Sequence, residues 1–330
     1  MKSLKEQIRD GEFSKLYLFY GDEPYLIRLN SGRIKKALMT EEDEMMNFDL
    51  FRENIDTEAL KISLETLPFM CERRLVFVEN SGAFTSKAPE SLTRELEHAA
   101  ESLPDTTTVV FMEKDVDKRS RMFKAAQKYG QVLEMNHPGE QELGIWISQE
   151  FRRRNVRIDQ NNISYFLSLT GGNMENILSE IQKLAGYVKE KGVVAREDID
   201  LLVTPSVETK IFRLTDHLGS GRQDQAYLAY QELLRQNEKP EMIFYMICRQ
   251  FHLLYRTSLM ERESADTVAA ELKLRPFVAR EYKRQAGMFG RERLLKLVKK
   301  LYQFDLGFKT GEITVQEALD LVLLRYASLK

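Results

Sequence analysis

The sequence predicts an α/β domain followed by all-α regions, and three observations lead to this fold class. The chain has 330 residues, which is too long for one small core, so we expect two or three domains. Up to about residue 139, short apolar runs alternate with helix-like segments, as in a mostly parallel sheet with helices on both faces. Beyond that point apolar residues recur at helical spacing and no convincing strand follows.

Four apolar runs in the first part predict buried strands. Each run is short, rich in Val, Phe, Leu or Tyr, and bounded by charge or glycine. The runs are residues 16–20, 75–78, 108–112 and 132–135. Residues 91–103 and 120–130 have helical character, so strands and helices alternate along this part of the chain.

The middle of the chain predicts a small helical block. Leu143, Trp146, Ile147 and Phe151 recur at three- and four-residue steps and form one face of an amphipathic helix. Asn173 is placed to cap the next helix. The apolar stripe of that helix consists of Ile177, Ile181, Leu184, Ala185 and Val188.

The last part, from about residue 210, predicts a helical bundle. Thr314 and Glu317 have the spacing of a capping box at the start of the last helix. Two apolar stripes follow helical spacing: Ile243, Met246, Ile247, Gln250, Phe251 and Leu254 in one helix, and Ala318, Leu319, Val322, Leu323 and Tyr326 in the last one. We expect most of these side chains to form the core of the bundle.

The composition is that of an ordinary globular protein. The net charge of −2 gives no overall attraction to nucleic acid, so any DNA contact must come from a local patch or from a basic partner. No apolar stretch approaches the roughly 20 residues that cross a bilayer, and the charged start has no signal-peptide core. Cys71 and Cys248 lie far apart, as is common in a reducing compartment. We expect a cytoplasmic protein without membrane contact.

The turn after the first predicted strand has the position of a phosphate-binding loop but not its residues. Such a loop needs glycine amides around the phosphates, a lysine to neutralise them and a hydroxyl for magnesium. Here Gly21 is followed by Asp22, Glu23 and Pro24, and the two carboxylates would repel a triphosphate. We therefore expect no ATP and no other cofactor at this turn. A divergent ATPase with an unusual phosphate site remains the alternative from the enzyme class.

Other active-site patterns are missing from the sequence as well. The histidines are dispersed without the spacing of metal ligands, at His98, His137, His217 and His252. Glu79, at the end of a predicted strand, resembles an acidic magnesium-binding position, but a structural role is the commoner one for such a residue. We predict no catalytic residue and no metal site.

Six segments, in order along the chain, resemble the delta subunits of bacterial DNA polymerase III. They are YLFYGDEPYLI (17–27), LETLPFMCERRLVFVEN (64–80), VVFMEKDVDKRSRMFKAAQKYG (109–130), LTGGNMENILSEIQKL (169–184), RQFHLLYR (249–256) and FDLGFKTGEIT (304–314). The resemblance covers essentially the full length. It implies an ATPase-like (AAA+-type) domain without a functional phosphate loop at 1–139, a helical lid at 140–209 and a helical collar for oligomerisation at 210–330.

The same resemblance implies a function in DNA replication. A delta subunit is a non-catalytic part of the clamp loader. The delta subunit binds the sliding clamp (the beta subunit) and holds one of the clamp's interfaces open for loading on primed DNA. ATP is bound by the neighbouring motor subunits (gamma or tau), which the collar joins together with the delta-prime subunit. A general scaffold or adaptor that never meets a clamp shares every bulk property with this hypothesis.

In this family the clamp is bound by a helix of the first domain that ends just before the third strand. The matching stretch contains Leu67, Pro68, Phe69, Met70, Arg73 and Arg74. Phe69 lies where the family has an apolar residue that enters a pocket of the clamp, and Met70 or Leu67 is expected to accompany it. Pro68 departs from the enterobacterial form, which has leucine there. From the residue pattern alone, Phe69 packed inside the domain is the simpler expectation.

Basic residues form candidate contacts with the clamp and with DNA. Arg73 and Arg74 are candidates to face an acidic surface of the clamp. Lys296, Lys299 and Lys300 lie on one side of a predicted helix and are candidates to contact DNA phosphates in the assembled loader. Further basic residues cluster at 152–157 and at 280–284. A solvated helix face is the commoner explanation for such runs.

Overall fold

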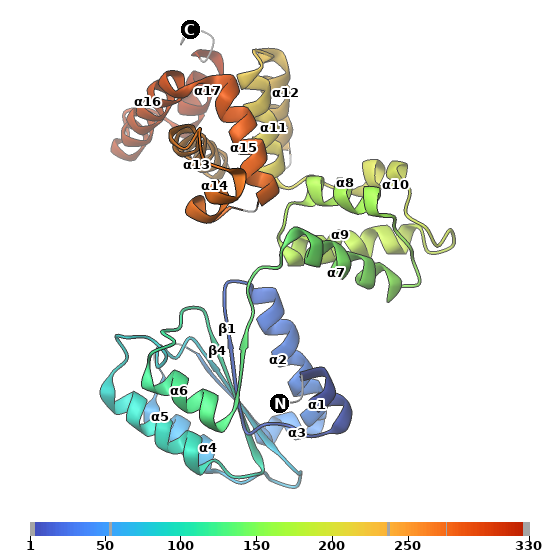
Figure 1. Cartoon of the computed structure of the whole chain (residues 1–330), viewed down its shortest axis with the longest axis vertical. Helices are drawn as coiled ribbons and strands as arrows, with labels where there is room; N and C mark the ends of the chain where they lie inside the picture. The colour runs from blue at the N-terminus through green and yellow to red at the C-terminus, as the bar shows by residue number, and fades with distance from the viewer. Residues whose placement is uncertain (1–3, 53–54, 236–237, 275, 326–330) are drawn as a thin grey trace. The chain divides into compact units, whose positions relative to one another are not determined.

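The computed structural model describes residues 4–52, 55–235, 238–274 and 276–325 (Figure 1). By packing, the chain divides into two units, Met1–Pro138 and Gly139–Lys330. No helix among the described residues is long and apolar enough to span a bilayer.

The first unit is built on a parallel sheet, as the alternating pattern predicts. The five strands are β1 (Leu16–Tyr20), β2 (Phe48–Arg52), β3 (Arg74–Glu79), β4 (Thr107–Glu113) and β5 (Gln131–Glu134), in the order β2-β3-β4-β1-β5. Leu18 of β1, which lies between β4 and β5, is in register with Phe111 of β4 and with Val132 of β5. The four predicted runs all form strands, whereas β2 at the sheet edge was not predicted.

Helices cover both faces of this sheet (Figure 1). The helices are α1 (Leu4–Asp10), α2 (Pro24–Leu38), α3 (Glu41–Asn47), α4 (Thr57–Glu65), α5 (Glu90–Ser102) and α6 (Arg121–Tyr129). Leu16 and Leu18 of β1 pack with α4, α5 and α6, whereas Tyr17 and Phe19 face the core formed with α1 and α2. Because side chains alternate across a strand, one fully buried strand supplies both cores.

The second unit is helical, as predicted. Its helices are α7 (Glu140–Arg152), α8 (Gln160–Thr170), α9 (Met174–Tyr187), α10 (Arg196–Leu202), α11 (Val207–Gly219), α12 (Gln223–Arg235), α13 (Pro240–Leu259), α14 (Ala265–Leu272), α15 (Pro276–Phe289), α16 (Arg291–Thr310) and α17 (Val315–Arg325). The Asn173 side chain caps α9 by accepting a hydrogen bond from the amide of Asn176 at 2.9 Å. Thr314 and Glu317 form the predicted capping box of α17.

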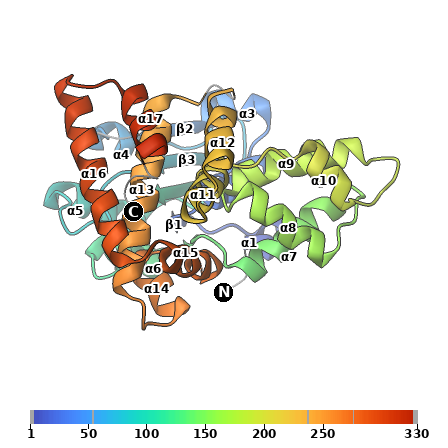
Figure 2. The ribbon, with the colours of Figure 1, turned by 90° about the horizontal axis from the view of Figure 1, so that it is seen from above.

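One hydrophobic core joins α11 to α17, and α16 and α17 lie beside α13 in both views (Figures 1 and 2). The predicted stripes of α13 and α17 belong to this core, although Tyr326 lies outside the described residues. The core draws on residues from Ile211 onward. The division of the second unit into a lid at 140–209 and a collar at 210–330 stays a prediction.

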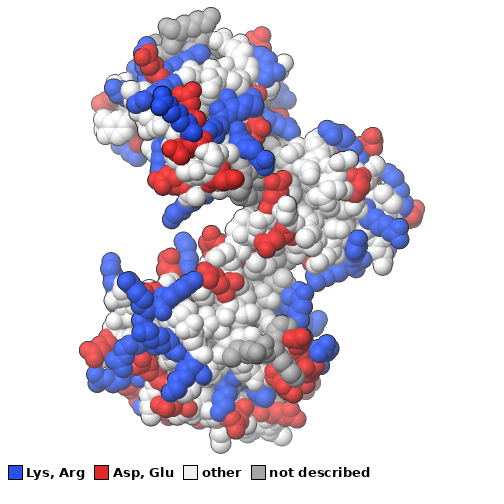
Figure 3. Space-filling view, viewed as in Figure 1, with Lys and Arg blue, Asp and Glu red and all other residues white. Residues whose placement is uncertain are grey.

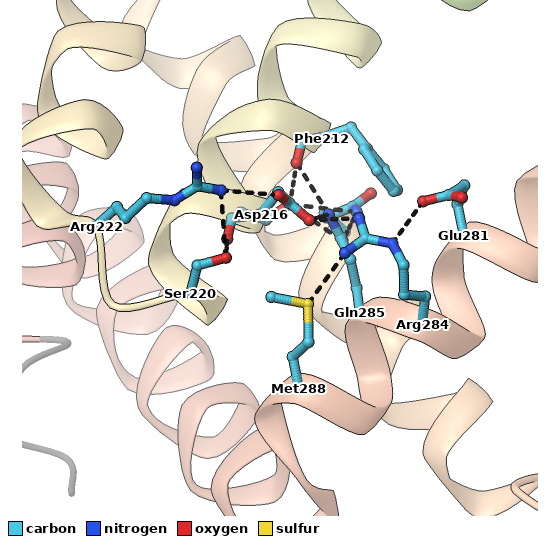
Figure 4. A network of polar contacts seen from close by, with 10 residues as sticks. Phe212, Asp216, Ser220, Arg222, Glu281, Arg284, Gln285 and Met288 are labelled. Carbon is cyan, nitrogen blue, oxygen red and sulfur yellow. Dashed lines mark hydrogen bonds and ion pairs between the residues drawn. The ribbon is translucent and has the colours of Figure 1, made fainter.

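A polar network also crosses this helical bundle, from α11 to α13 and α15 (Figure 4). The fully buried Gln285 donates to the carbonyl oxygen of Phe212 at 3.1 Å and accepts from the side chain of Gln250 at 3.2 Å. Asp216 accepts hydrogen bonds from Arg284 at 2.5 Å and from Gln285 at 3.3 Å. Burial raises the pKa of Asp216, but these donors outweigh it and hold the pKa below its usual range.

Replacing Gln285 should destabilise the bundle without any effect on a binding surface. In Gln285→Ala, the Gln250 amide and the Phe212 carbonyl lose a buried partner, so we expect the free energy of unfolding to fall by about 1–3 kcal/mol. Urea unfolding followed by circular dichroism measures this change. The exposed Gln303→Ala on α16 is the matched control and should stay within about 0.5 kcal/mol. An equal loss in both chains would contradict the structural role of the network.

Candidate functional site

The turn after β1 is held tightly by the chain itself. Gly21 has φ 136°, and a Cβ at this position would lie 2.4 Å from the carbonyl oxygen of Met135, so only glycine fits without a shift. The carboxylate of the buried Glu23 caps α2 by accepting a hydrogen bond from the amide of Tyr25 at 3.0 Å. The start of α2 is thus occupied by an acidic side chain of the same protein.

Both acids of this turn also bind the segment that follows β5. The amide of His137 donates to Oδ1 of Asp22 at 2.7 Å, and Nδ1 of His137 lies 2.6 Å from Oε2 of Glu23. Two acceptor-only carboxylates at a helix start satisfy backbone donors and do not attract an anion. Among the described residues, no group of three or more His, Cys, Asp or Glu side chains is arranged to hold a metal ion.

The stretch matched to clamp binding lies in a loop and not on a helix, which corrects one expectation. Helix α4 ends at Glu65, and β3 begins at Arg74. Pro68 disfavours the helical conformation for Leu67, because its ring collides with the backbone of the residue before it. Thr66 completes the end of α4, since its amide donates to the carbonyl of Ile62 at 3.0 Å. Residues 66–73 therefore form a connection between helix and strand.

This loop presents apolar side chains to solvent. Leu67 is 67% exposed, Phe69 58% and Met70 90%, while Pro68 is half-buried. The alternative that Phe69 packs inside the domain is wrong in this structure. Met70 has φ 56°, in the left-handed region that side chains other than glycine rarely occupy.

Asn47, the last residue of α3, holds the backbone of this loop. Its side-chain amide donates to the carbonyl oxygen of Phe69 at 3.0 Å, and its side-chain oxygen accepts from the Phe69 amide at 2.6 Å. Asn47 is 1% exposed. The sequence analysis missed this residue. Thr40 and Asp43 could have signalled the start of α3 through their capping box, but no pattern connects position 47 with position 69.

The two arginines of this stretch have different surroundings, and the prediction for Arg74 is wrong. Arg74 is buried on β3, and its guanidinium donates to the carbonyl of Ser63 at 3.0 Å, to the carbonyl of Met46 at 3.2 Å and to the carboxylate of Asp49. Its charge is used inside the domain, because a buried guanidinium must be paired. Arg73 is half-buried and donates to the carbonyl of Asp105 at 3.4 Å.

The candidate DNA-contact lysines lie on α16. Lys296 and Lys299 are exposed, while Lys300 is half-buried, 5.2 Å above the ring of Phe304, and bonded to Gln303 at 3.2 Å. Over the helices from α11 onward, basic and acidic side chains are interspersed on the face that Figure 3 shows. Lys296 and Lys299 are therefore the two members of the set that are most open to a partner.

The basic run at 152–157 separates into two pairs. Arg153 and Arg154 both bond to the buried carboxylate of Glu150 and so neutralise it. Arg152 and Arg157, together with Ser148 and Ile158, line a cavity of about 460 Å³.

The chain is similar to DNA polymerase III delta subunits along most of its length. The model of the family "DNA polymerase III, delta subunit" matches residues 17–136, and the model of its C-terminal domain matches residues 208–326. DNA polymerase III subunit delta of Bacillus subtilis is 29% identical over 98% of this chain and 95% of its own length. A probable delta subunit of Aquifex aeolicus is 19% identical over 76% of this chain and 73% of its own length. The solved structure of the Bacillus subtilis DNA clamp loader delta protein has a TM-score of 0.74 at 27% identity, covering 98% of each chain.

The two neighbouring arginines should respond differently to substitution. Arg74→Met removes one hydrogen-bond donor from the carboxylate of Asp49 and one from each of two carbonyls, so we expect the free energy of unfolding to fall by about 2 kcal/mol or more. Arg73→Met, the matched control, should change it by about 0.5 kcal/mol or less. Chemical denaturation of both chains measures the difference, and equal values would contradict the internal role of Arg74.

Proposed function

The chain belongs to the DNA polymerase III delta subunit family, as its resemblance predicted. From this premise we propose that it opens the sliding clamp. In this proposal it binds the ring-shaped clamp and holds one interface open while the ring is placed on primed DNA in the cytoplasm. The observation that carries the proposal is the 58% exposure of Phe69 in a loop that the domain holds in place.

The loop has the physical properties of a binding hot spot. Leu67, Phe69 and Met70 are adjacent, exposed and apolar, and monomeric proteins seldom leave such side chains clustered on the surface without a partner. An aromatic ring gains much from burial and loses little side-chain entropy. Pro68 restricts the backbone between Leu67 and Phe69, which lowers the ordering cost on binding. Arg73 stays in the proposed surface, whereas Arg74 does not.

The first domain is proposed to be a platform without catalysis of its own. Glu23 caps α2 where a phosphate would lie, and the turn lacks the lysine and hydroxyl that a triphosphate needs. ATP would be bound by the gamma or tau motor subunits, which the collar at 210–330 would join together with delta-prime. Exposed apolar residues of the collar helices, such as Tyr245, Tyr302 and Leu306, are available for these contacts.

Removing the Phe69 ring should weaken clamp binding and leave the fold intact. We expect Phe69→Ala to weaken binding to the cognate clamp by about 2 kcal/mol or more, because the ring would fill an apolar pocket of the partner. Surface plasmon resonance measures the affinity, and circular dichroism checks the fold. Tyr187→Ala is the control, because Tyr187 on α9 is an aromatic residue of similar exposure, 59%.

Three outcomes of this experiment are informative. Binding that is lost only in the folded Phe69→Ala chain supports the proposal and its anchor. Binding retained by Phe69→Ala keeps the clamp-opening function and moves the contact elsewhere. No binding by the folded wild-type chain would favour a general scaffold or adaptor.

Charge reversal on α16 should affect DNA and not the clamp. If Lys296 and Lys299 contact phosphates, the double change to Glu should reduce DNA-dependent clamp loading by the assembled complex several-fold and weaken its salt dependence. Binding to the clamp alone should not change. The control is Lys124→Glu with Lys189→Glu, two exposed lysines, one on α6 and one in the turn after α9. Unchanged loading at moderate salt would remove these lysines from the DNA surface.

A further inference from the structure

The exposed Phe69 is attached to the domain through its backbone and not through its ring. Both polar groups of its peptide backbone pair with one side chain, since Asn47 donates to the carbonyl oxygen and accepts from the amide. These two hydrogen bonds resemble those of a hydrogen-bonded residue pair in an antiparallel sheet, with the side-chain amide of Asn47 in place of the second strand's backbone. It fixes where the chain runs at Phe69 while leaving the ring 58% exposed.

Asn47 is itself held firmly at the end of α3. The helix begins with a reciprocal capping box, in which the Asp43 amide donates to Thr40 at 3.2 Å and the Thr40 amide donates to Asp43 at 3.0 Å. At its other end, Arg74 donates to the carbonyl of Met46 at 3.2 Å. Asn47 is thus a fixed point from which the loop is positioned.

Without the hydrogen bonds from Asn47, two energetic terms would favour a different conformation of the loop. Burial of an exposed aromatic ring is favourable, so a free loop would tend to turn Phe69 toward the domain. The left-handed conformation of Met70 is unfavourable in free energy, so it persists only where surrounding contacts stabilise it. Asn47 opposes both tendencies, because turning Phe69 inward would leave a side-chain amide unpaired at a position 1% exposed.

We propose that Asn47 is a positioning residue for clamp binding, which holds the loop in the conformation that presents Phe69. The inference rests on the proposed function and adds α3 to the clamp-binding surface. Met46, next to Asn47, is 60% exposed and extends the apolar surface beyond the loop. Asn47 contributes to affinity by organising the free chain before the clamp arrives.

A double-mutant cycle between Asn47→Ala and Phe69→Ala tests this inference. Affinities for the cognate clamp are measured by surface plasmon resonance on the full chain, with melting temperatures recorded beside them. We expect Asn47→Ala to weaken binding about tenfold in the wild-type chain, but less than about twofold in the Phe69→Ala chain, because it acts through Phe69. Hydrogen exchange at the Phe69 amide should accelerate in Asn47→Ala without any clamp present.

Two further variants separate positioning from a general loosening of the region. Glu44→Gln removes the ion pair between α3 and Lys35 of α2, 2.9 Å long, and leaves the pairing with Phe69 in place, so it should not change clamp affinity. Asn47→Gln keeps both the donor and the acceptor on a side chain one methylene longer, so it should weaken binding less than Asn47→Ala. It replaces Asn47→Ala in the cycle if that chain does not fold.

The outcomes distinguish this inference from the proposed function. If the wild-type chain binds and Phe69→Ala weakens binding, but Asn47→Ala is neutral or its effect adds fully to that of Phe69→Ala, Asn47 is not a positioning residue and the clamp function stands. An equal loss in Glu44→Gln would also overturn the inference. No clamp binding by the folded wild-type chain overturns both.

Discussion

The buried guanidinium of Arg74 is the interaction on which the candidate site depends. It joins the carbonyl of Met46 at the end of α3, the carboxylate of Asp49 on β2 and the carbonyl of Ser63 on α4. A charge taken out of water is costly unless every donor is paired, so the three elements must meet at Arg74 in one arrangement. The loop between α4 and β3 begins and ends next to these contacts of Arg74. Its exposed side chains are therefore held in a defined position.

The turn after β1 uses acidic residues in a comparable way. Where a nucleotide-binding protein would leave a helix start open for phosphate, Glu23 caps α2 and lies against His137, and Asp22 holds the amide of His137. The parallel sheet and its covering helices remain, while the groups at this edge are satisfied internally. Under the proposed function, this domain presents the clamp-binding loop while neighbouring subunits hydrolyse ATP.

Much of the fold follows from local sequence patterns, and the failures have physical causes. Continuous apolar runs predicted the buried strands, and caps such as Asn173 and Thr314 predicted helix starts, because both depend on neighbouring residues. Strand β2 was missed because Asp49 and Arg52 interrupt its apolar pattern at the sheet edge. The buried role of Arg74 and the reach of Asn47 depend on contacts more than 20 residues away in sequence, which no local pattern encodes.

The central claim is that the loop following α4 and the adjacent end of α3 bind the sliding clamp. Hydrogen exchange of the full chain, measured by mass spectrometry with and without saturating clamp, tests it most directly. If the clamp binds there, exchange should become slower in peptides that contain residues 45–47 and 66–73, with little change in the peptides of α7 to α10. Unchanged exchange in both of these segments while another region becomes protected would contradict it.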